Sequence, residues 1–228
     1  MSRSAVSTDP WRQRVDSADW EAITAEVNSL GGALLPPLVT PGEAQRIREL
    51  YGQAGYFRST VDMGRHRFGE GQYRYFKTPY PEPIEQLKQA LYPHLLPIAR
   101  DWAAKLCWSA LWPDTLDEWL RMCHGAGQGK PTAILLRYQA GDWNALHRDL
   151  YGDLVFPPQV VINLNEPGTD HTGGSFSSWS SARGPSPAAP PPSYRTATAT
   201  CSPPGTALSG PREAGQQHRY GTACRSSD

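Results

Sequence analysis

The chain has 228 residues, enough for one good-sized hydrophobic core or two small ones. Its 22 basic and 22 acidic residues cancel, so the composition gives no electrostatic indication of nucleic acid or acidic lipid as a partner. No apolar run approaches the roughly 20 residues of a membrane span, and the polar N-terminus lacks the apolar core of a signal peptide. The four cysteines form neither a CxxC zinc pattern nor a dense disulfide framework, so we expect a cytoplasmic protein with no membrane partner.

The first 130 residues are predicted to form a mainly helical support region that contains one hairpin. A helix is expected over 10–30, where apolar residues recur every three to four positions. Thr40, Pro41 and Glu43 provide the cap, first-turn proline and third-position acid that begin a second helix, through about residue 51. Residues 56–77 alternate aromatic with polar or basic positions, which is typical of a hairpin. Further helices are expected over 83–105 and 114–124, with four tryptophans in or near them that we interpret as packing residues.

Two strand-like segments follow, and a histidine and an aspartate lie between them. The first contains residues 134–138 and the second residues 156–165. If the chain stays extended after residue 138, His147 and Asp149 share one strand face, because alternate side chains of a strand point the same way. An imidazole and a carboxylate are two of the three protein ligands in the facial triad that binds ferrous iron. The sequence therefore predicts a metal site at His147 and Asp149, with a third ligand, a histidine, on a later strand.

The composition changes abruptly after Phe176. Residues 177–228 contain a single Leu and no Ile, Val, Phe, Met, Lys or Asn. Such a segment buries too little apolar surface to offset the entropy lost on ordering. One interpretation is a genuine disordered, proline-rich interaction tail. The other is that a single-base deletion between about Gly174 and Ser178 has put the rest of the gene out of frame, since back-translation in the displaced frame yields protein-like strings.

The residues before this point resemble a known family. The sequence is similar to bacterial 2-oxoglutarate- and Fe(II)-dependent dioxygenases related to the prolyl 4-hydroxylase type. The resemblance covers most of residues 20–176 and depends on these segments: Tyr138-x-x-Gly141, His147-Arg-Asp149, Leu150-Tyr-Gly-Asp153, Phe156-Pro157, Gln159 to Asn165, Glu166-Pro-Gly168 and Thr172-Gly-Gly174. It implies an α+β fold, with N-terminal helices packed on a double-stranded β-helix, or jelly roll, that begins at residues 131–176 and is incomplete in this chain.

The resemblance also implies a site and its cofactors. His147 and Asp149 would bind Fe(II), and Tyr138 would donate a hydrogen bond to 2-oxoglutarate, the cosubstrate. Dioxygen is the second cosubstrate, ascorbate is an additional candidate cofactor, and the substrate that is oxidised is unknown. The implied activity is hydroxylation of a C–H bond, with no catalytic residues expected beyond the metal site.

Two residues that the family requires have no clear counterpart here. The family uses a distal histidine as third ligand and a basic residue, commonly arginine, that pairs with the far carboxylate of 2-oxoglutarate. After residue 149 the only histidines are His171, which we interpret as a loop residue, and His218, which has no strand context. We therefore expect this copy to be inactive. The alternative function is a non-catalytic, cupin-like binding protein with a genuine C-terminal interaction tail.

The remaining candidate residues have competing interpretations. His66, His94 and His124 lack partners at ligand spacing and are interpreted as surface or capping residues. A basic and aromatic group on the expected hairpin either contacts a substrate or forms a solvated face, and we favour the solvated face. That group is Arg65, Arg67, Arg74 and Tyr75.

Overall fold

The computed structural model describes residues 9–66, 69–109, 111–145, 152–172, 179–180, 184–185 and 197–201. Its helices are α1 (Pro10–Asp16), α2 (Trp20–Leu30), α3 (Pro41–Glu49), α4 (Glu82–Lys105) and α5 (Leu116–Gly125), with short 3-10 turns η1 (Leu50–Gly52), η2 (Ala54–Tyr56) and η3 (Met63–His66). Its strands are β1 (Gly32–Leu34), β2 (Phe57–Asp62), β3 (Gly69–Glu70), β4 (Gln72–Phe76), β5 (Ile134–Arg137), β6 (Trp143–Asn144), β7 (Pro158–Ile162), β8 (Trp179–Ser180), β9 (Gly184–Pro185) and β10 (Ala197–Cys201). Helices and sheets are mixed, as the predicted α+β class requires.

The segment expected to be one helix over 10–30 forms two helices. Each has its own N-cap: Asp9 Oδ1 accepts the Trp11 N–H at 2.9 Å, and Asp19 Oδ1 accepts the Ala22 N–H at 3.0 Å. The second cap interrupts the helix because it holds residue 19 outside helical geometry. Gly31 then ends α2 in the left-handed conformation at φ 83°.

The predicted start of α3 is confirmed. Thr40 and Glu43 form a reciprocal capping box, in which the Glu43 N–H donates to the Thr40 hydroxyl and the Thr40 N–H donates to the Glu43 carboxylate. The same carboxylate accepts two bonds from Arg14 Nη2, at 3.1 and 3.0 Å. This ion pair fixes the beginning of α3 against α1.

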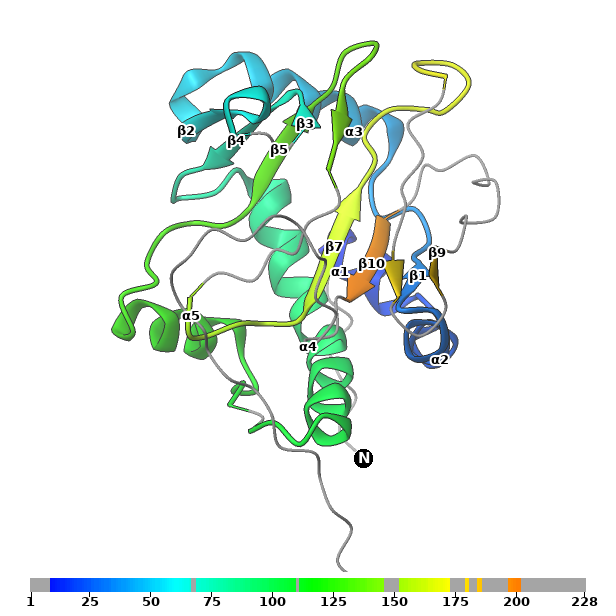
Figure 1. Ribbon diagram of the computed structural model, residues 1–228, viewed down its shortest axis with the longest axis vertical. Coiled ribbons are helices and arrows are strands. Elements are labelled where there is room, and N and C mark those ends of the chain that lie inside the picture. Colours follow the sequence, from blue (N-terminus) through cyan, green and yellow to red (C-terminus); the bar gives the residue numbers. More distant parts are fainter. Residues whose placement is uncertain are drawn as a thin grey trace, which may run out of the picture.

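α4 is the central helix of the molecule (Figure 1). One side of it packs against α1 and α2, where Val15 and Val27 meet Leu91 and Ile98 in a buried cluster. Another side of α4 packs against α5 in a second buried cluster. That cluster contains Tyr92, Leu96, Ala99, Ala103, Trp112, Leu116 and Trp119. Trp102, Trp112 and Trp119 are buried, which confirms that these tryptophans serve packing, whereas Trp108 is exposed.

The predicted hairpin, β2 and β4, forms two of the three strands of an antiparallel sheet with the order β2, β4, β5. β2 pairs with β4 with Thr60 opposite Arg74, and β4 pairs with β5 with Arg74 opposite Leu135. A register shift between Phe57 and Ser59 marks a bulge on β2, the edge strand. The short β3 pairs with β6 instead.

A second antiparallel sheet has the order β1, β10, β7 (Figure 1). Its central strand, β10, lies within residues 177–228, and its Ala199 is opposite Ala33 of β1 and Val160 of β7. The sequence of β10 contains two β-branched threonines, which favour strands. The division of the chain at residues 130 and 176 into a helical region, a first part of a jelly roll and a tail stays a prediction.

Two further observations concern the expected environment of the protein. Within the described residues, no helix has both the length and the apolar character needed to cross a membrane. Cys107, exposed in the turn after α4, is disulfide-bonded, whereas Cys123 is a half-buried free thiol. Burial raises the pKa of the Cys123 thiol.

Candidate functional site

His147 and Asp149, the predicted metal ligands, lie outside the described residues. The described chain runs through β5 and β6 to residue 145 and resumes at residue 152. The prediction that the two side chains share a strand face therefore stays a prediction. Among the residues that are described, no three His, Cys, Asp or Glu side chains come together as a metal site would require.

Tyr138, the predicted 2-oxoglutarate contact, directly follows β5. Its ring lies against Gly71, where an added Cβ would come within 2.8 Å of Tyr138 Cδ1. Gly71 has φ 130°, so both its backbone conformation and this close approach favour glycine. Partial burial raises the pKa of Tyr138, while a hydrogen bond with the Asn144 side chain opposes the rise. The phenol is therefore a neutral hydrogen-bond donor at pH 7.

Tyr138 continues an apolar face of the sheet, and no described residue covers that face. On β5 the side chains alternate: Leu135 is buried against Ile47, Tyr51 and Phe76, whereas its two neighbours point to the other face. The exposed fractions on that other face are 38% for Ile134, 37% for Leu136 and 43% for Tyr138. One face of this sheet is thus packed and the other is open.

The described histidines do not converge on Tyr138. His171 lies in the loop that follows β7, near Asn163, with its carbonyl accepting the Gly168 N–H at 2.8 Å. His94 stacks on Trp20 with ring centroids 4.6 Å apart and contacts Asp16 at 2.7 Å. The loop interpretation of His171 is therefore confirmed, and His94 is a packing residue between α4 and the N-terminal helices. His124 is exposed at the end of α5, and His218 lies outside the described residues.

The structure brings together a cationic and aromatic group on the packed face of the sheet, which the sequence revealed only in part. The Arg74 and Arg137 guanidinium carbons each lie 4.5 Å from the centroid of the Tyr51 ring. Arg74 Nη1 also donates to the Tyr51 carbonyl at 2.5 Å, and Arg74 lies 5.5 Å from the Phe57 ring. Arg74 was considered from the sequence, but Arg137 and Tyr51 were not. The available signal was the period of two, which puts Arg74 and Arg137 on one face once β4 and β5 pair.

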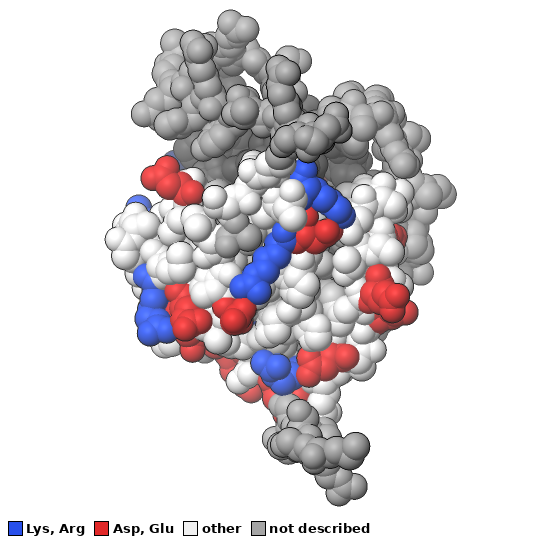
Figure 2. All heavy atoms as spheres, turned by 90° about the horizontal axis from the view of Figure 1, so that it is seen from below, with Lys and Arg blue, Asp and Glu red and all other residues white. Residues whose placement is uncertain are grey.

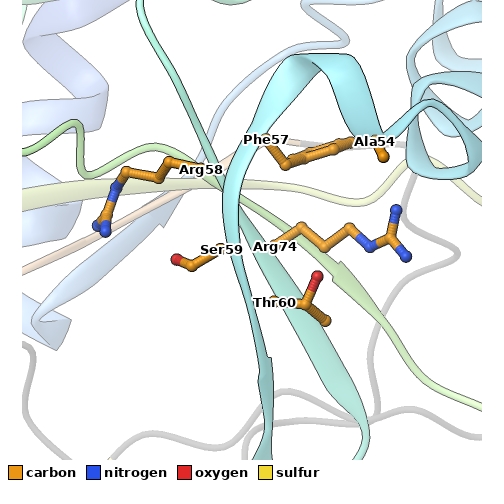
Figure 3. Close-up of a pocket in the computed structure, with 6 residues that line it drawn as sticks. All are labelled: Ala54, Phe57, Arg58, Ser59, Thr60 and Arg74. Atoms are coloured by element: carbon orange, nitrogen blue, oxygen red, sulfur yellow. The ribbon is translucent and has the colours of Figure 1, made fainter.

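A cavity of about 240 Å³ adjoins this group at the edge strand β2 (Figure 3). Six residues line it: Ala54, Phe57, Arg58, Ser59, Thr60 and Arg74. Figure 3 shows Phe57, Thr60 and Arg74 on one side of β2 and Arg58 on the other. The Arg58 guanidinium lies 4.1 Å from the Tyr75 ring centroid and donates to the Pro131 carbonyl through Nε and Nη2. Arg65 is exposed, and Arg67 lies outside the described residues.

Charge elsewhere on the molecule is mixed in sign. Figure 2 shows basic and acidic side chains next to one another on the face seen from below. Exposed ion pairs of the described residues include Arg100 with Asp114 and Lys105 with Asp101. By contrast, no ion pair of the described residues involves Arg58, Arg74 or Arg137.

Comparison with known proteins gives a family match for the middle of the chain. Residues 71–181 match the family Oxygenase-NA, described as an oxygenase catalysing oxidative methylation of damaged DNA. The matched stretch contains Tyr138, His147 and Asp149, and it ends close to residue 177, where the composition changes.

The chain also resembles two curated proteins of Mycobacterium tuberculosis, from two strains and both uncharacterized. Each is 64% identical over 101 residues, which is 44% of this chain and 43% of the relative. No solved structure matches this chain. The chain matches less than half the length of these relatives. Residues 71–181 are thus similar to an oxygenase family.

Proposed function

We propose that this chain contains the first part of an Fe(II)- and 2-oxoglutarate-dependent oxygenase that acts on DNA. The observation that carries the proposal is the open apolar face formed by Ile134, Leu136 and Tyr138. A jelly roll closes when its last strands pair with and cover its early ones, so a chain that lacks those strands leaves such a face open. DNA is proposed as the substrate because the matched family is described as acting on damaged DNA.

His147 and Asp149 are the proposed protein ligands of Fe(II), and Tyr138 is the proposed hydrogen-bond donor to 2-oxoglutarate. A histidine and a carboxylate suit ferrous iron and leave further positions open. When bound, the iron and the keto acid would supply the oxidising chemistry. The role proposed for Tyr138 has separate support, because its phenol stays protonated at pH 7 and lies on an exposed sheet face.

The proposed ligands lie outside the described residues, and the described residues themselves form no cluster of metal-ligating side chains. We propose that the chain as printed is inactive, since the residues after about Gly174 would be read out of frame. The missing parts would be a distal histidine and the basic residue that pairs with 2-oxoglutarate.

The nucleotide sequence from the Thr172 codon to beyond the stop codon is the first test. If the displaced frame carries the codon bias and continues to a histidine, an arginine and a further strand, the out-of-frame interpretation is correct. If the printed frame carries the bias, the tail is genuine, and a non-catalytic binding protein becomes the better proposal.

The second test compares the printed chain with a chain in which one base restores the frame. We expect the restored chain to convert 2-oxoglutarate to succinate in the presence of Fe(II), and the printed chain to show no turnover. The variant His147→Ala in the restored chain should abolish Fe(II) binding, whereas the matched variant His124→Ala, at an exposed residue of α5, should leave it unchanged. Equal turnover by both chains would show that the printed tail is not the defect.

A further inference from the structure

The three arginines of the β2–β4–β5 sheet are unusual in their surroundings. Arg74 and Arg137 are like charges held on one Tyr51 ring, and neither forms an ion pair with a described carboxylate. The three strands carry these two arginines and Arg58 against one acid, Asp62. Two cations that share one ring repel each other, so an anion beside them would be bound favourably.

Two polar atoms in this group have no hydrogen-bond partner among the residues that the structure describes. The Arg74 Nε and the Tyr51 hydroxyl are both buried without one, and Tyr51 itself is only 7% exposed. Buried polar groups in folded proteins are normally satisfied, so these two unsatisfied donors leave the cationic group short of acceptors. Arg74 lines the cavity together with the Thr60 hydroxyl, which is a further donor.

The cavity geometry favours a phosphate group. A guanidinium offers planar pairs of donors that match phosphate oxygens. Contacts with aromatic rings and with main-chain carbonyls hold the Arg74 and Arg58 guanidinium groups in place before a ligand arrives, and their remaining N–H groups are left for the ligand. The volume of about 240 Å³ is large enough for a phosphodiester with part of its sugar. The cavity is also at the edge of the sheet, where an extended strand of nucleic acid has access.

We propose that the phosphodiester backbone of a single DNA strand binds across the edge strand β2. Arg74 and Thr60 would contact it on one side of β2 and Arg58 on the other, with Arg137 contributing from the Tyr51 ring that it shares with Arg74. The proposal rests on the proposed function, from which it takes DNA as the substrate, and it adds the surface that positions the strand. It also explains how a chain with no net charge would bind a polyanion, since these three cations of one sheet form no ion pair with an acid among the described residues.

The test is fluorescence anisotropy of a labelled oligothymidine with the full chain, measured over a range of salt concentrations without iron or 2-oxoglutarate. We expect binding at low salt, and a loss on the order of tenfold in the double variant Arg58→Gln, Arg137→Gln. Both side chains are exposed, so the fold should be retained. The slope of log K against log salt should fall by about 0.7 for each lost contact.

Matched variants and controls make each outcome decisive. Arg121→Gln on α5 removes the same charge from a distant exposed site and should leave affinity and slope nearly unchanged. Arg74→Lys keeps the charge but loses the fork, so it should weaken binding by more than Arg121→Gln does. Equal affinities of the double variant and Arg121→Gln, or no binding by the wild type at low salt, would overturn the proposal.

Two further results separate this proposal from others. If inorganic phosphate raises the melting temperature while the oligonucleotide does not bind, the site accepts free anions and the DNA proposal is wrong. Because the assay omits iron and 2-oxoglutarate, a chain without oxygenase activity can still bind DNA here. Conversely, an active restored chain whose DNA affinity is insensitive to Arg58 and Arg137 would contradict this inference alone.

Discussion

At the scale of single residues, Glu43 connects local and tertiary structure. Burial alone would raise the pKa of its carboxyl, but the hydrogen bonds from Thr40 and the adjacent Arg14 guanidinium outweigh burial, and the net pKa is lowered from 4.5. The ionised carboxylate is therefore favoured in the folded state. A group with a lowered folded pKa contributes stability that is fully present above its unfolded pKa and is lost as the pH falls through the folded value.

We expect Glu43→Gln to destabilise the protein by about 1 kcal/mol at pH 7, the usual cost of losing a capping interaction of this kind. The difference from the wild type should be constant above about pH 5 and shrink as the pH falls below 4.5, because the wild-type carboxyl then becomes protonated. Urea unfolding at pH 7 and at pH 3 measures this. The matched variant Glu49→Gln, exposed on the same helix, should show neither effect, and a pH-independent loss in Glu43→Gln would contradict the explanation.

At the scale of elements, α4 contains two internal prolines, Pro93 and Pro97. A proline removes one helical hydrogen bond and frees the carbonyl four residues earlier. For Pro93 that carbonyl belongs to Gln89, and it accepts a hydrogen bond from Arg12 of α1. At Pro93, Arg12 of another helix thus replaces the donor that the freed carbonyl has lost. At Pro97, no hydrogen bond of the described residues supplies such a replacement.

We expect Pro97→Ala to stabilise the protein by about 1–2 kcal/mol, because the new N–H restores a helical bond while the unfolded chain gains some entropy. Pro93→Ala should stabilise it less, since its N–H competes with Arg12 for the Gln89 carbonyl. Thermal unfolding followed by circular dichroism gives both values. Pro83→Ala, at the first turn of α4 where proline is tolerated, is the control and should be close to neutral. A destabilised Pro97→Ala variant would show that the helix requires its bend.

The helix boundaries show how closely the elements could be predicted from the sequence. The capping residues Thr40, Pro41 and Glu43 correctly located α3, and α4 and α5 begin and end within about two residues of their expected limits. The prediction of one helix over residues 10–30 is wrong, because the apolar period continues across Asp19 although its side chain caps a new helix. Periodicity reports which face is buried, but a local side-chain bond decides where a helix breaks.

At the scale of the whole molecule, the β2–β4–β5 sheet is packed on one face only. Leu135 on the packed face is buried in the cluster of Ile47, Tyr51 and Phe76, whereas Leu136 on the other face is exposed. If restoring the frame supplies the closing strands, Leu136 becomes a core residue. The cost of removing its side chain then reports whether the sheet has been covered.

We expect Leu136→Ser to cost less than about 1 kcal/mol in the printed chain, and about 2–5 kcal/mol in the restored chain, where the side chain would be buried. Leu135→Ser should be strongly destabilising in both chains, because Leu135 is buried already. Equilibrium unfolding of the four variants and the two parents measures these differences. Equal costs of Leu136→Ser in both chains would contradict the incomplete jelly roll.

The α+β class, most helices, the hairpin and the candidate ligands His147 and Asp149 could be predicted from the sequence, because caps, side-chain period and residue chemistry are local properties. The sequence did not predict that Arg74 and Arg137 both lie against the ring of Tyr51, or that the open face of β5 is the one that bears Leu136. Both depend on which strands pair and which helices cover them. Strand pairing and coverage join residues far apart in the chain, and a local sequence pattern specifies which face is apolar but not what covers it.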